Sequence, residues 1–192
     1  MGDVVSWRSR STPGEANARV GMRIVLAAWA MMFVALLFTW AFVKAGPGPG
    51  SSPGAPVPSP AMAAAATACL AFTGGGLFLA SRAAAAGRRK WIQAALVLSL
   101  ASAAAAVALE VLLVLDGRRL RMAGASGGLL LTMVAFHVWQ GALGVPALAV
   151  LVRRALAGAY GPGRAVGIQL WGRYWYAVLA MWCAVAFVLY MA

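Results

Sequence analysis

Long apolar runs that are almost free of charge dominate this chain and limit what it can fold into. About 20 helical residues are needed to cross the ~30 Å hydrocarbon core of a bilayer. Five runs are long enough or close to it, at residues 24–43, 61–80, 91–115, 127–152 and 174–192. No alternation of apolar and polar residues with a period of two competes with them. The sequence therefore predicts an all-α integral membrane protein, a five-transmembrane-helix bundle.

Composition excludes the main alternative classes. Of the 192 residues, 63% are hydrophobic and 10% are charged, whereas a soluble domain carries about 25% charged residues to present a wettable surface. The net charge of +12 would suggest nucleic-acid binding in a soluble protein. Here the basic residues lie in short segments between apolar runs, a pattern that sets orientation in a bilayer. We therefore expect no nucleic-acid partner.

The distribution of Lys and Arg predicts the orientation. Twelve of them lie before the first run, after the second and after the fourth, and four lie on the opposite side. The positive-inside rule then places the N-terminus in the cytoplasm and the C-terminus outside. We interpret 1–23 as a retained cytoplasmic polar tail, 24–192 as a single membrane domain and the Pro- and Gly-rich segment 44–60 as an external loop.

The last run carries a spaced aromatic pattern, and three other runs carry short motifs that accompany it. The pattern is Y-W-x-x-V-x-x-x-W with a later tyrosine, formed by Tyr174, Trp175, Val178, Trp182 and Tyr190. The other motifs are "LAAWAMMFVALLFTW" in the first run, "ALEVLL" in the third and "FHVWQG" in the fourth. Together they resemble subunit III of the haem–copper oxidases, the family of cytochrome c oxidase and its quinol-oxidising relatives, in a short five-helix bacterial form.

The resemblance implies a function and a set of partners. A chain of this kind would be a non-catalytic component of a respiratory terminal oxidase in a bacterial inner membrane. It would support assembly, lipid packing and proton entry in an enzyme that reduces oxygen and translocates protons. Its partners would be the catalytic subunit I, subunit II and phospholipids. Haem and copper would lie in those partner subunits, and we expect no catalytic residue, cofactor or metal ligand in this chain.

Two alternatives stay open. The homologous accessory protein associated with nitric oxide reductase would share the fold and look alike in sequence. A small membrane transporter belongs to a different class, and would need paired charges near the midplane or a repeated, broken helix.

Several polar positions of the family are apolar here. The carboxylate of the family's first helix falls on Trp29, and the aspartate of its last helix falls on Leu179. A family histidine of the last helix falls on Tyr176. The resemblance therefore predicts a retained scaffold with much of its polar equipment replaced.

Two intramembrane polar residues are candidates for helix contacts. His137 is followed by Gly141 and Gly144 on nearly the same helical face, where small residues let a neighbouring helix approach and the imidazole bond across the contact. A single histidine without Cys or carboxylate companions at ligand spacing argues against a haem or metal site. Glu110 must be protonated or paired in lipid, and we expect Gln140 to be its hydrogen-bond partner. A proton-conducting role for Glu110 is the alternative.

The aromatic pattern defines one face of the last helix. Trp175, Val178, Trp182 and Tyr190 fall within about 120° at 100° per residue. Trp182 lies near mid-membrane, away from the aromatic belts of the two interfaces, so we expect an exposed aromatic face that packs against another subunit. The candidates for subunit or lipid contact are Trp175, Trp182, Tyr190, His137, Gly141, Glu110 and Trp29.

Two smaller features give local expectations. Cys69 and Cys183 fall inside apolar runs without metal-ligand spacing, and we expect both to be small buried hydrophobes. The triplet Gly74 to Gly76 predicts either close approach of another helix or a kink.

Overall fold

Five helices make up almost all of the computed structural model, which describes residues 13–46, 58–117 and 124–191. They are α1 (Pro13–Ala45), α2 (Pro60–Ala85), α3 (Arg89–Asp116), α4 (Ala125–Leu156) and α5 (Val166–Met191). All five are long and apolar enough to cross a membrane, and the described residues contain no strand. The predicted all-helical class, with five helices long and apolar enough to cross a membrane, is confirmed.

Local signals explain where several helices begin and end. Pro13 and Pro60 open α1 and α2, since proline at the first position has no N–H to leave unpaired. Ser59 caps α2, its Oγ accepting from the backbone N–H of Met62 at 3.5 Å. Lys44 lies in the last turn of α1, where a positive charge interacts favourably with the helix dipole.

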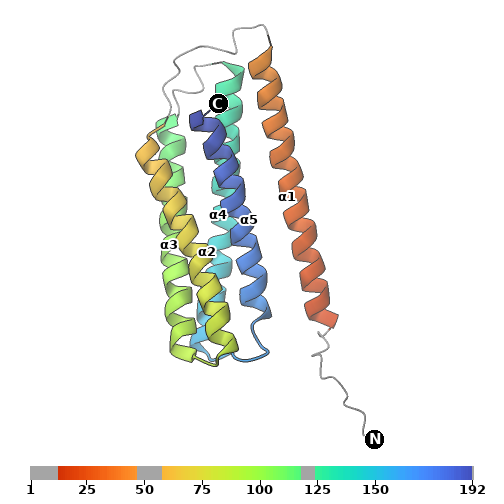
Figure 1. The fold of residues 1–192 in the computed structure, drawn as a ribbon, viewed down its shortest axis with the longest axis vertical. Helices are drawn as coiled ribbons and strands as arrows, with labels where there is room; N and C mark the ends of the chain where they lie inside the picture. Colours follow the sequence, from red (N-terminus) through yellow and green to blue (C-terminus); the bar gives the residue numbers. More distant parts are fainter. Residues whose placement is uncertain (1–12, 47–57, 118–123, 192) are drawn as a thin grey trace, which may run out of the picture.

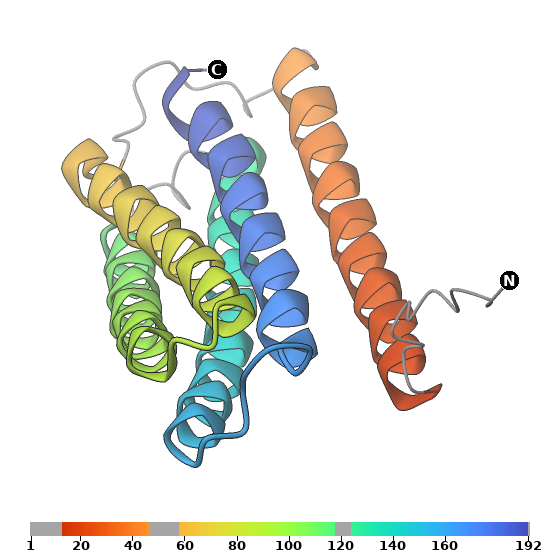
Figure 2. The ribbon, with the colours of Figure 1, turned by 60° about the horizontal axis from the view of Figure 1, so that its bottom comes forward.

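Four helices form a closed ring, and the fifth lies outside it. Within the described residues, α2 packs against α3 and α5, and α4 packs against the same two helices, while α2 does not contact α4 and α3 does not contact α5. The last two pairs are therefore the diagonals of a four-helix bundle, as Figures 1 and 2 show. The core of the protein lies along the axis of this ring.

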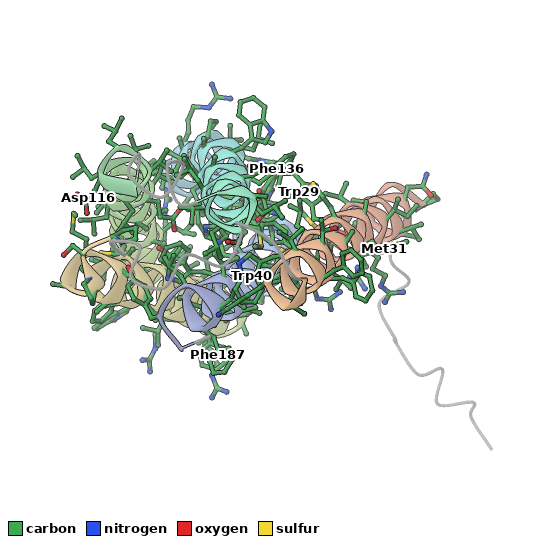
Figure 3. All side chains as sticks on the ribbon, turned by 90° about the horizontal axis from the view of Figure 1, so that it is seen from above. Trp29, Met31, Trp40, Asp116, Phe136 and Phe187 are labelled. Carbon is green, nitrogen blue, oxygen red and sulfur yellow. The ribbon has the colours of Figure 1, made fainter. Side chains whose placement is uncertain are left out.

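Helix α1 is the least integrated helix. Among the described residues it contacts α4 and α5 alone, and it stands apart from the other four helices in Figure 1. In its most apolar stretch 11% of residues are buried, against 28% to 39% in the other helices. Phe33 and Trp40 are its two buried residues; Figure 3 shows Trp40 directed towards the bundle and Met31 away from it.

Hydrogen bonds tie the two ends of the bundle. At one end the backbone N–H of Ser59 donates to Asp116 Oδ2 at 3.1 Å, and the Tyr190 hydroxyl donates to the carbonyl of Pro58 at 3.1 Å. At the other end Arg89 Nη2 donates to the carbonyl of Leu156 at 2.9 Å, and Gln93 donates to that of Ala155 at 3.2 Å. These last two bonds satisfy carbonyls at the carboxyl end of α4, which lack partners within the helix.

The glycine triplet allows close approach of two neighbouring helices. Helix α2 runs through it without interruption. A methyl group on Gly74 would lie 3.0 Å from Cε1 of Tyr176 on α5, and one on Gly76 would collide with Ser99 Oγ on α3, whereas one on Gly75 would meet nothing within 4 Å. Of the two explanations that the sequence left open, close packing accounts for Gly74 and Gly76.

One expectation is wrong, one predicted boundary is extended, and some predictions fall on residues that the structure does not describe. Helix α1 begins at Pro13, so the second half of the expected polar tail is helical. Much of the expected external loop, at 47–57, lies outside the described residues. The same is true of residues 118–123 and of Arg8 and Arg10 in the tail. Cys183 is exposed rather than buried, because the larger aromatic side chains of α5 occupy its buried face. Cys69 on α2 is half-buried.

The different surroundings of adjacent glycines give a test. We expect Gly76→Ala to lower the free energy of unfolding by about 1–3 kcal/mol, because the added methyl group overpacks the α2–α3 contact. Gly75→Ala is the matched control and should leave stability unchanged or raise it, since alanine favours the helix. Unfolding in mixed detergent micelles followed by circular dichroism measures both; equal effects would contradict the close packing.

Candidate functional site

A histidine at the centre of the bundle is the candidate site. His137 lies on α4 and is fully buried, as is Glu110 on α3. The Nδ1 atom of His137 is 3.0 Å from Glu110 Oε2, and its Nε2 atom is 2.9 Å from the backbone carbonyl of Val178 on α5. The imidazole therefore connects α3 and α5, the two helices that lie diagonally across the ring.

The carbonyl of Val178 determines which nitrogen of His137 carries hydrogen. A carbonyl oxygen only accepts, so Nε2 must be protonated and donate. The proton between Nδ1 and Glu110 then has two positions. Either a protonated Glu110 donates to a neutral imidazole, or an imidazolium donates to a carboxylate. In both arrangements the pair has no net charge, which is the condition under which an acid and a base can be buried in a membrane interior.

Aromatic rings extend this centre to the remaining helices. The ring of Trp182 on α5 lies 5.1 Å from that of His137, and Phe33 on α1 meets it edge-on at 6.4 Å. The indole N–H of Trp182 donates to Thr67 Oγ1 on α2 at 2.7 Å. The His137 cluster, which we define as Glu110, His137, Val178, Trp182 and Thr67, thus joins the four helices of the ring, and Phe33 brings α1 against it.

Glycines on α4 make room for the neighbours of this cluster. A methyl group on Gly141 would lie 2.6 Å from Cγ2 of Val107 on α3, and one on Gly144 would lie 2.6 Å from the indole of Trp175 on α5. The expectation that these glycines admit a neighbouring helix is therefore confirmed. The neighbours are two different helices, α3 at Gly141 and α5 at Gly144. Both helices lie close enough to α4 for short hydrogen bonds to form across the contacts.

The expected partner of Glu110 was wrong. We expected Gln140 at similar depth, but Glu110 bonds His137, one turn earlier on α4. Gln140 instead donates to Sδ of Met181 at 3.5 Å, and its backbone carbonyl accepts from the Tyr174 hydroxyl at 2.7 Å. Position along the helices does not determine which of Gln140 and His137, one turn apart on α4, faces Glu110 on α3.

The expected exposed aromatic face was also wrong. Trp175 and Trp182 are completely buried and Tyr190 is half-buried, so the face packs inside this chain. Glu110, His137 and Gly141 are buried too, and of the residues expected to contact a subunit or lipid, only Trp29 and Tyr190 keep partial exposure. Trp29 is half-buried on α1 (Figure 3). The residues of the aromatic stripe were identified correctly, but the stripe faces the interior of this chain and not a neighbouring subunit.

The sequence analysis missed Thr67 and the role of the Val178 carbonyl. Thr67 lies in the alanine-rich part of α2, where a lone hydroxyl residue opposite a mid-membrane tryptophan was the available signal. The Val178 carbonyl carries no sequence signal at all, because every residue has one.

The chemistry open to the cluster follows from its burial. Glu110 and His137 can hold and transfer one proton between them, but neither reaches solvent, so exchange with water requires the helices to separate. Oε1 of Glu110 is buried without a hydrogen-bond partner among the described residues. The described ranges contain no group of three or more His, Cys, Asp and Glu that could hold a metal ion.

Comparison with known proteins adds no assignment. No family model matches the chain, and a search of curated proteins finds no match.

The pairing of Glu110 can be tested by a double-mutant cycle. Glu110→Leu and His137→Leu should each destabilise by about 1–3 kcal/mol, because each leaves a buried partner unsatisfied. The double variant should cost less than their sum, with a coupling of about 0.5–3 kcal/mol. Unfolding titrations measure the cycle. The control is the cycle of Glu110→Leu with Gln140→Leu, and a larger coupling there would contradict the geometry.

The two buried tryptophans differ in one hydrogen bond. The Trp182 N–H has a partner, while the Trp175 N–H is buried without one among the described residues. Both rings are fully buried, so Trp→Phe removes similar volume at each. We expect Trp182→Phe to cost about 1 kcal/mol more than Trp175→Phe, measured by the same unfolding titration. An equal or reversed order would show that the bond to Thr67 contributes nothing.

Proposed function

We propose that this chain is a non-catalytic, subunit III-like component of a haem–copper respiratory oxidase in a bacterial inner membrane. The observation that carries the proposal is that segments carrying the resemblance lie together in the structure. Glu110 of "ALEVLL", His137 of "FHVWQG" and Val178 and Trp182 of the last helix come from three separate segments. All three segments contribute to one buried cluster. Matches that arose independently by chance would have no reason to converge in space.

The burial of the cluster favours a structural role over transport. The acid and the base bond one another rather than lining an open path, and a transporter would need polar groups accessible from each side in turn. The basic end of the bundle would face the cytoplasm by the positive-inside rule. Catalysis, haem and copper would belong to the partner subunits. The chain would support their assembly, the surrounding lipid and proton entry.

The outer face of α1 is the docking surface in this proposal. Met31, Val34, Phe38 and Phe42 follow one another at helical spacing and are 65% to 74% exposed. Helix α1 has few contacts with the rest of the chain, and an apolar groove of about 500 Å³ remains between it and α5. Between membrane helices, packing supplies what the hydrophobic effect supplies in water. A neighbouring subunit would give α1 the packing that the bundle does not.

Isolation of the complex tests the proposal. A tagged chain, isolated from its natural membrane in a mild detergent, should bring with it a haem redox spectrum and peptides of a larger oxidase subunit. The haem signal should vanish when the chain is separated from them. Peptides of nitric oxide reductase would instead support the alternative assembly. Isolation as a solitary chain without haem would contradict both.

Matched variants test the docking surface separately. Phe38→Ala, on the outer face of α1, should lower the haem recovered per chain about fivefold, as expected for loss of a central packing residue. Phe72→Ala on α2 removes a side chain of similar exposure, 66% against 73%, and should change nothing. Equal recovery with both variants would show that α1 faces lipid alone.

A further inference from the structure

A groove between α2 and α3 opens at the most basic end of the bundle. Its volume is about 510 Å³. Arg82, Arg88 and Trp91 line it near the turn between the two helices, and Leu79, Ala83, Ala94, Ala95 and Leu98 line it farther along them. Small alanines on both helices leave the space open, and the two leucines are largely exposed along it. From Trp91 to Leu98 the groove follows α3 for about 10 Å, at 1.5 Å per residue.

The end of the groove near this turn combines features that attract an anion at a membrane surface. Arg82 and Arg88 are exposed, and among the described residues neither forms an ion pair with a carboxylate. Arg82 lies 5.9 Å from the Phe78 ring on its own helix, a contact that restrains its guanidinium. Helix α3 begins at Arg89, so the positive end of its dipole adds to the field at the same place.

The body of the groove has the opposite character. Alanine and leucine side chains offer an acyl chain contact but offer a soluble anion nothing. Trp91 is 66% exposed in the first turn of α3, and tryptophan is enriched at the boundary between headgroups and hydrocarbon. Basic pockets between membrane helices bind anionic lipid headgroups for these reasons.

We propose that this groove is a binding site for an anionic phospholipid. The phosphate would lie between Arg82 and Arg88 and one acyl chain along the alanines of α2 and α3. The site stands on its own observations and would remain if no redox partner of the chain were found.

Native mass spectrometry of the purified full-length chain tests the site. The ligands are phosphatidylglycerol, phosphatidylcholine with the same acyl chains, and glycerol 3-phosphate as the headgroup alone. We expect phosphatidylglycerol to bind more tightly than either. The double variant Arg82→Gln/Arg88→Gln should weaken its binding roughly tenfold. Arg153→Gln/Arg154→Gln removes the same charge from the same end of the bundle and should leave binding unchanged.

A second pair of variants tests the acyl-chain part without changing charge. Ala94→Leu should fill the groove and weaken phosphatidylglycerol binding, while Ala104→Leu, at an exposed position of α3 outside the groove, should not. Equal weakening by the two arginine pairs would mean attraction by diffuse charge and would overturn the proposal. So would equal binding of the two lipids, or glycerol 3-phosphate binding as tightly as the lipid.

Discussion

The two hydrogen bonds of His137 are the constraint on which the rest of this structure depends. In lipid an unpaired polar group costs several kcal/mol, and the chain has only one histidine to place. Its two nitrogens take one partner from α3 and one from α5, helices that do not otherwise touch within the described residues. The position of α4 relative to both is therefore fixed by chemistry that tolerates little displacement, since hydrogen bonds weaken steeply with distance and angle.

The small residues and the aromatic rings follow from that constraint. Short bonds between helices need close backbones, which Gly141 and Gly144 of α4 provide. The space that remains inside the ring is filled by Trp175 and Trp182 of α5, so the aromatic face of that helix is interior. In the proposals made above, a partner subunit would contact the outer face of α1 and an anionic lipid would occupy the α2–α3 groove.

The class of fold was predictable from the sequence, while the assignment of faces was not. Run length and lack of charge predict the five helices because a bilayer imposes both on any helix that crosses it. The aromatic stripe of α5 was also visible, but all its neighbours are apolar, and periodicity does not say whether a stripe faces protein or lipid in that setting. For the same reason the sequence predicted Gln140 as the partner of Glu110 and missed His137. The choice depends on helix rotation, which packing against α5 sets.

The protonation of His137 tests the central claim most directly. Because the chain contains one histidine, a ¹⁵N-histidine-labelled sample gives a single side-chain spectrum by nuclear magnetic resonance. The account predicts that Nε2 carries hydrogen, that this hydrogen exchanges slowly with deuterated water, and that it shows a coupling across a hydrogen bond to a backbone carbonyl. An unprotonated Nε2, or a hydrogen that exchanges as fast as that of an exposed imidazole, would contradict the account.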